Sequence, residues 1–182
     1  MPKPNMSQVQ NAIQDPLLSI NYAFWFPVLP TAVATTAVPH LLLQCKSATK
    51  PGSTINAVEI QLFGYTFEHR GNKSFNHDMS VSYMENSQLD ITRIIEAWSE
   101  YACSAQTQSG APKLGTTGYA KDGVFTIFNQ QDKAVAQYII HACWPSVVPD
   151  LSFNGESATA LDVQATFKFD WYEPDPSFTP QA

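Results

Sequence analysis

Residues 161–172 alternate strictly between apolar and polar side chains. Leu161, Val163, Ala165, Phe167, Phe169 and Trp171 are the apolar positions of this stretch. Because successive side chains of a strand point to opposite faces, the pattern predicts a long strand with one apolar and one wet face. Together with a strand over 134–144 and a turn over 145–157, it favours the wall of a β-barrel or sandwich.

The same period of two runs through residues 55–84. Val58, Ile60 and Leu62 alternate with Ala57, Glu59 and Gln61, then Tyr65, Phe67 and His69 with Thr66, Glu68 and Arg70, then Met79, Val81 and Tyr83 with Ser80 and Ser82. Gly64 interrupts the alternation and predicts a bulge or bend. Gly71 and Asn72 predict a turn over 70–73, which makes the stretch a long hairpin and places His69 and His77 as neighbours across the turn.

A helix is expected at about 87–104. Ile91, Ile94, Ile95, Trp98 and Ala102 form one apolar stripe at helical spacing. Ser87 and Asp90 have the spacing of a capping box at its start. The single apolar stripe predicts a helix that covers a sheet.

The remaining segments predict shorter elements. Strands are expected at 19–29, 40–48 and 123–129, with a connector at 31–37 and a loop at 105–120. No Asp, Glu, Lys or Arg occurs between Asp15 and Lys46, but four prolines interrupt this span. Prolines break a lipid-exposed helix, so we expect two buried strands there and no membrane segment. A secretory signal is not expected either.

Several short phrases resemble a known family. They are Trp144-Pro145, Val-Pro-Asp-Leu at 148–151, Phe-Asp-Trp-Tyr-Glu at 169–173, Gln-Cys-Lys-Ser-Ala-Thr-Lys-Pro-Gly at 44–52, and the run from Gly64 through Met84 followed by a helix. Over roughly residues 40 to 173 the chain is similar to the tail tube proteins of contractile-tailed bacteriophages. The resemblance implies a mainly β fold: an antiparallel barrel or sandwich of the tail tube type, with one packed helix and extended loops for ring assembly.

The domain boundaries follow from the pattern and the resemblance together. They are an N-terminal arm at 1–18 that docks on a neighbouring subunit, a single domain at 19–173, and a C-terminal tail at 174–182. The resemblance implies a structural protein whose hexameric rings stack inside a contractile sheath. The channel would conduct double-stranded DNA and hold the tape measure protein. The implied partners are other copies of the chain, the sheath protein, a baseplate tube initiator and a tail terminator, in a virion tail assembled in the cytoplasm of a bacterial host.

The resemblance also implies roles for particular residues. The polar face of the 55–84 hairpin would line the channel through Glu59, Gln61, Thr66, Glu68, Ser80 and Ser82. Trp98, Trp144 and Trp171 would be core or assembly anchors. The alternation alone favours an ordinary solvent-facing side of an antiparallel sheet, and it is the resemblance that favours a channel wall.

Composition and motifs narrow the function classes. The formal net charge is −6, which argues against stable binding to phosphates but permits nucleic acid to slide past. The three cysteines have no CxxC spacing and are expected to be reduced thiols, and a zinc site at His141 and Cys143 lacks further ligands. No catalytic motif is found, so no catalytic residue, metal or cofactor is expected. A tube of a related injection device or type VI secretion system, and a monomeric ligand-binding β-barrel, are the alternative interpretations.

Overall fold

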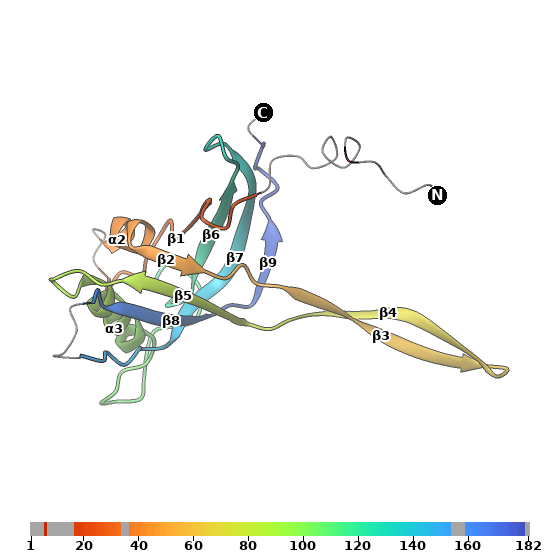
Figure 1. Ribbon diagram of the computed structural model, residues 1–182. Helices are drawn as coiled ribbons and strands as arrows, with labels where there is room; N and C mark the ends of the chain where they lie inside the picture. Colours follow the sequence, from red (N-terminus) through yellow and green to blue (C-terminus); the bar gives the residue numbers. More distant parts are fainter. Residues whose placement is uncertain (1–5, 7–16, 34–36, 154–158, 181–182) are drawn as a thin grey trace.

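The computed structural model describes residue 6 and residues 17–33, 37–153 and 159–180. Most of the predicted N-terminal arm lies outside these ranges. In chain order the elements are β1 (Tyr22–Trp25), α2 (Ala37–Leu43), β2 (Cys45–Ala48), β3 (Ser53–Leu62), β4 (Tyr65–Phe75), β5 (Asp78–Met84), α3 (Asp90–Ala102), β6 (Lys121–Phe128), β7 (Ala134–Val147), β8 (Asp162–Lys168) and β9 (Trp171–Pro174). Figure 1 shows a β body from which β3 and β4 project.

The body is a bent antiparallel sheet in the order β1-β6-β7-β8-β5-β2, with β9 also beside β7. The first part of β7 pairs with β6 and β9, and its last residues pair with β8. The strand bends at Ala142, whose φ is 56°, and the Asp122 carboxylate accepts a hydrogen bond of 3.0 Å from the Ala142 N–H. One strand thus passes from one half of the sheet into the other, and the predicted mainly β, antiparallel fold with a packed helix is confirmed.

The core lies between the two halves of the sheet and α3. The predicted inward positions of β5 and β8 are buried: Met79, Val81, Tyr83, Val163, Ala165 and Phe167. The apolar stripe of α3 is buried against them, and Phe24 and Phe26 add their rings from the β1 side. Trp98 meets Phe26 at a ring-centroid distance of 5.0 Å and Phe167 at 6.0 Å.

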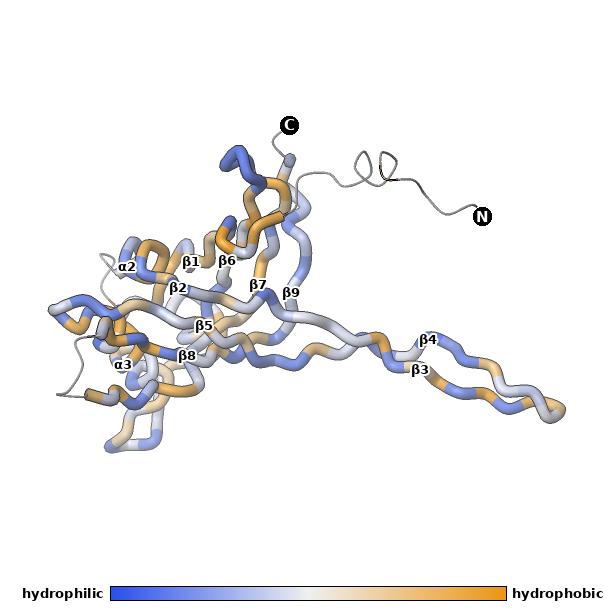
Figure 2. Tube along the Cα trace, viewed as in Figure 1, coloured by the Kyte–Doolittle hydropathy of each residue, from blue (hydrophilic) through white to orange (hydrophobic). Residues whose placement is uncertain are grey.

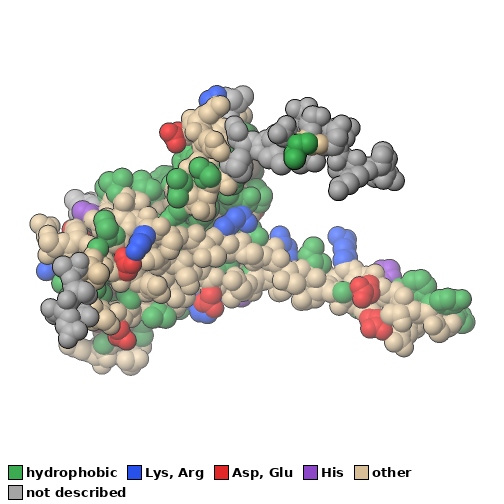
Figure 3. Space-filling view, in the orientation of Figure 1, with side chains coloured by type: hydrophobic (Ala, Val, Ile, Leu, Met, Phe, Trp, Pro, Cys, Tyr) green, Lys and Arg blue, Asp and Glu red, His purple; other side chains and the backbone are tan. Residues whose placement is uncertain are grey.

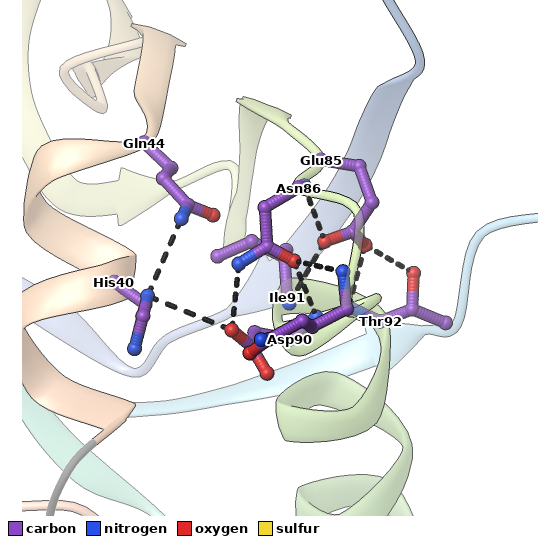
Figure 4. A network of polar contacts seen from close by, with 8 residues as sticks. His40, Gln44, Glu85, Asn86, Asp90, Ile91 and Thr92 are labelled. Carbon is purple, nitrogen blue, oxygen red and sulfur yellow. Dashed lines mark hydrogen bonds and ion pairs between the residues drawn. The ribbon is translucent and has the colours of Figure 1, made fainter.

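The start of α3 differs from the prediction. Leu89 occupies the N-cap position in a left-handed conformation and has no side-chain cap, so the capping box of Ser87 and Asp90 is wrong. Instead, the Glu85 carboxylate accepts hydrogen bonds from the N–H groups of Ile91 and Thr92. Figure 4 shows Glu85 and Asn86 reaching the first turn from the end of β5. A carboxylate there also meets the positive end of the helix dipole, which explains why a box at Ser87 is not needed.

The strand predicted over 40–48 is only half right. Residues 40–43 belong to α2, and the strand begins at Cys45. Pro39 lies in the first turn of the helix, where its missing N–H costs no hydrogen bond. A short apolar run does not distinguish a buried strand from a buried helical turn, and here the turn buries Leu41.

The predicted bulge and turn of the long hairpin are exchanged. Leu62 pairs with Tyr65, so the chain reverses at Phe63 and Gly64, both with positive φ (51° and 83°). This is the two-residue turn that glycine favours in hairpins. Gly71 instead lies in a bulge within β4, where an added Cβ would lie 2.7 Å from the Asn56 carbonyl oxygen. Since no turn exists at 70–73, His69 pairs with Val58 and does not face His77 across a turn.

The predicted strand over 161–172 is divided in two. β8 ends at Lys168 and β9 starts at Trp171. Between them the Phe169 N–H donates to the His77 carbonyl at 3.2 Å, and the Asp170 N–H donates to the His141 carbonyl at 3.0 Å. β8 therefore pairs with β5 and the end of β7, whereas β9 pairs only with an earlier part of β7, while the alternation continues across the break.

The three cysteines are free thiols, with Cys103 exposed and Cys143 buried. Burial raises the pKa of the Cys143 thiol above the usual 9.0, and it also raises the pKa of the Cys45 thiol, which is less deeply buried. Above that pH the unfolded chain releases thiol protons that the folded chain keeps, so we expect stability to fall as pH rises past 9.0. Urea unfolding midpoints across this range measure the effect. Cys143→Ala should make the decline shallower, whereas Cys103→Ala should keep it; equal slopes for both would contradict the prediction.

Candidate functional site

The most unusual surface is the hairpin arm, residues 53–75, formed by β3 and β4. Every side chain from 53 to 70 is exposed. β3 and β4 form a two-stranded sheet of their own, separate from the body (Figure 1). A lone two-stranded hairpin is only marginally stable in water. The arm therefore has the character of a segment that is completed by another molecule.

The two faces of the hairpin arm differ. In the register, Val58 lies opposite His69, Ile60 opposite Phe67, and Leu62 opposite Tyr65. Because opposite residues share a face, these form an apolar face, and Figure 2 shows the alternation along both strands. Phe63, at the tip, is 98% exposed. An apolar ribbon face ending in an exposed ring is typical of a protein–protein contact.

The other face of the hairpin arm is polar. Glu59 lies directly opposite Glu68, and Gln61 lies opposite Thr66. Like charges at opposite positions destabilise a strand pair. The Gln61 amide donates a hydrogen bond of 2.8 Å to the Glu59 carboxylate, which offsets part of this repulsion. The isolated arm is thus weakly held together by its own contacts.

The root of the hairpin arm is fixed to the body by cations over aromatic rings. Lys50 Nζ lies 4.4 Å from the ring centre of Tyr138 and 4.6 Å from that of Tyr172. Lys73 Nζ lies 5.9 Å from the Tyr172 ring centre. The Tyr172 hydroxyl contacts the Ser53 hydroxyl at 3.3 Å, and this bond together with the two lysines lowers the pKa of Tyr172. These contacts set the direction in which the arm leaves the body.

A second surface covers the outer side of β2, β5 and β8, and we call it the hydroxyl face. A shallow depression in it is lined by Ser47, Thr49, Ser80, Ser82, Gln164 and Thr166 together with backbone of neighbouring residues. Two ion pairs flank the depression, Lys46 with Asp162 and Lys168 with Asp78. Figure 3 shows this part of the body as mostly neither apolar nor charged. The surface is polar, and its charges are balanced in pairs.

The structure divides the predicted channel residues between these surfaces. Ser80 and Ser82 lie on the hydroxyl face, whereas Glu59, Gln61, Thr66 and Glu68 lie on the hairpin arm. Sequence reasoning missed both lysine–aspartate pairs of the hydroxyl face. Each pair joins residues far apart in the chain. The alternation of a strand predicts that such side chains point outward, but it does not predict which of them meet.

The three predicted tryptophan anchors have different surroundings. Trp98 is fully buried, and its indole N–H donates to the Tyr119 carbonyl at 2.6 Å. Trp144 is half-buried, edge-on to Tyr119 at 5.7 Å. Trp171 is 46% exposed and stacks on His141 at 4.7 Å. Trp98 is therefore a core residue, and Trp171 is the one available at the surface.

His141 is a further polar centre, and its partners are Asp122 and Glu173 instead of Cys143. Its Nδ1 lies 3.3 Å from the Asp122 carboxylate, and its Nε2 lies 3.3 Å from that of Glu173. These contacts join β6, β7 and β9 beside the bend in β7. Cys143 points into the core instead, with its Sγ 3.4 Å from the Ile140 carbonyl.

Within the described ranges no group of three or more His, Cys, Asp or Glu side chains is placed to hold a metal ion. Across the same ranges, no helix has both the length and the apolar character needed to cross a membrane.

Comparisons with known proteins agree with this architecture. No curated protein matches the sequence. A tube–sheath complex of an extracellular contractile injection system in its extended state contains a similar chain, with a TM-score of 0.57, 12% identity, and coverage of 95% of this chain and 99% of that one. The sheath/tube terminator of the same kind of system gives a TM-score of 0.63 at 11% identity, covering 90% and 99% of the two chains. The tube-terminating cap of the anti-feeding prophage gives 0.58 at 14% identity, covering 90% and 93%.

At these low sequence identities, the similarity to the solved structures establishes the fold only. The family is established by the match of the sequence to a family model. The family model described as phage tail tube protein matches residues 20–174. The match runs from just before β1 to the end of β9, so it takes in the body and the hairpin arm together. Tail tube proteins are structural components, and no catalytic role is assigned to the chain. By this match the chain is a member of the phage tail tube protein family.

Proposed function

We propose that the chain is the subunit of a tail tube that forms stacked hexameric rings inside a contractile sheath. The observation that carries this proposal is the hairpin arm, which is exposed on both faces and which, beyond its root, is paired with no other described strand. A ribbon of this kind gains stability when its apolar face and its free edges meet another copy. The family match supports the same conclusion.

The hydroxyl face is the surface best suited to line the channel. It belongs to the main sheet of the body and carries hydroxyl and amide groups with balanced charges. Such a wall stays hydrated and offers a passing polyanion neither strong attraction nor an apolar patch. Ser80 and Ser82 are channel residues in this arrangement, and double-stranded DNA and the tape measure protein are the proposed contents.

The hairpin arm is the proposed contact between copies. Its apolar face, Val58, Ile60, Leu62, Tyr65 and Phe67, would be covered by a neighbouring subunit. Glu59, Gln61, Thr66 and Glu68 then remain on the opposite, water-facing side, and their position at the channel stays a prediction. The sheath protein, a baseplate tube initiator and a tail terminator complete the proposed partners, with assembly in the host cytoplasm before the tail is finished.

Electron microscopy of the purified chain tests the proposal. We expect negatively stained rings or rods with a central channel, and a sedimenting species several times heavier than one chain, as the protein concentration is raised. Association buries the exposed apolar surface, so the heavy species should grow with concentration. A compact monomer at every concentration, also when supplied with preformed baseplates, would contradict the tube subunit and favour a self-sufficient β-barrel.

A further inference from the structure

Both ion pairs of the hydroxyl face join a lysine to an aspartate of another strand, the neighbouring one for Lys168 and the next but one, across β5, for Lys46. Lys168 and Asp78 lie opposite each other in the register of β5 and β8, with Nζ and Oδ1 2.7 Å apart. Lys46, in the bulge of β2, contacts the Asp162 carboxylate at the start of β8. The side chains of all four are between 38% and 57% exposed. Their charges therefore face solvent, and within each pair the positive charge of the lysine is balanced by the negative charge of the aspartate.

We propose that Asp78 and Asp162 mask Lys168 and Lys46, so that DNA moving over the hydroxyl face meets no free cation. This inference rests on the proposed function for the position of the face at the channel. A free lysine that binds a phosphate releases a counterion, and each such contact steepens the salt dependence of binding by about 0.9 in logarithmic units. In a tube every lysine is repeated in each subunit of each ring, so even weak contacts would add up to a brake on DNA.

Asp78 and Asp162 contribute little to the folding stability of the protein. Exposed ion pairs contribute little to folding, and neither pair lies in the core. At the root of the hairpin arm, by contrast, Lys50 and Lys73 lie over aromatic rings, an arrangement that leaves their charge in place. Pairing with an aspartate also occurs elsewhere, between Lys113 and Asp170. On the hydroxyl face, however, both lysines are paired in this way.

Two variants with the same change in net charge separate masking from overall charge. Asp78→Asn with Asp162→Asn frees both lysines, whereas Glu59→Gln with Glu68→Gln removes two charges from the hairpin arm, outside the face. Fluorescence anisotropy with a short labelled DNA duplex, over a series of salt concentrations, measures the affinity of each full-length protein. We expect the first variant to bind several-fold more tightly than wild type, with a salt slope steeper by about 2. The control should stay within about twofold of wild type, since its charge change lies away from the lysines.

Removing the lysines as well should reverse the effect. Adding Lys46→Gln and Lys168→Gln to the aspartate variant is expected to return the affinity to that of wild type. Equal tightening in the aspartate variant and the arm control would overturn the masking proposal. If the aspartate variant loses its native circular dichroism, the exchange of Asp78→Lys with Lys168→Asp keeps a pair in place and must bind DNA no more tightly than wild type. Electron micrographs of the same preparations distinguish failure of the two proposals. Absence of rings or rods in the wild-type protein would contradict the proposed tube subunit, whereas the comparison of DNA affinities alone tests whether the aspartates mask the lysines.

Discussion

Trp98→Ala is expected to lower the free energy of unfolding by about 3–5 kcal/mol. The side chain is fully buried between α3 and the sheet, and its ring meets those of Phe26 and Phe167 edge-on or tilted. Its removal opens a cavity that the surrounding strands cannot fill. It also leaves the Tyr119 carbonyl without its indole donor.

Urea unfolding followed by far-UV circular dichroism measures this loss. Trp171→Ala is the matched control, because it deletes the same side chain from a position that is 46% exposed. That variant loses the stacking on His141 and should cost only about 1 kcal/mol. Similar losses for the two variants would contradict the assignment of Trp98 to the core and Trp171 to the surface.

Charges placed on the apolar face of the hairpin arm are expected to abolish assembly. Ile60→Asp with Phe67→Asp introduces two carboxylates at opposite positions of β3 and β4, on the face proposed to be covered by a neighbour. Burying an unpaired carboxylate costs several kcal/mol, which is larger than the gain from a typical contact between surfaces. The stability of the body should hardly change, because both side chains are exposed on the arm. The opposed charges weaken the pairing of β3 with β4, so the control must carry the same pair of charges.

The opposite face of the same ribbon supplies the control. Gln61→Asp with Thr66→Asp adds the same charges at the neighbouring pair of the register. Those side chains stay in water in the proposed tube, so this variant should still form rings or rods. Sedimentation velocity and negative-stain micrographs compare the two. Loss of assembly in both, or in neither, would contradict the proposed contact face.

The parts of the fold that were predictable are those that depend on local periodicity. The alternation around Val163, Ala165 and Phe167 and the stripe that includes Ile91 and Trp98 both identified buried faces correctly. Such patterns follow from the geometry of a single strand or helix, so they need no knowledge of a partner. The outward positions of Ser80 and Ser82 followed in the same way.

What failed depends on pairing between distant segments. Gly64 and Gly71 are each compatible with a turn or a bulge, and only the register of β3 against β4 decides which is which. The alternation continues unbroken through Phe169, although the pairing with β5 ends there and only β7 continues as a partner. The ion pair of Lys168 and Asp78 likewise exists only because β5 and β8 are neighbours. A single sequence carries no record of these pairings.

The bend at Ala142 has a mechanical consequence. Since β7 is hydrogen-bonded in both halves of the sheet, no interface between the halves exists that is held by side chains alone. A load applied to one half therefore passes to the other through the covalent backbone of β7 as well as through the shared core. In the proposed tube, this backbone link would help each subunit to resist the thrust of a shortening sleeve.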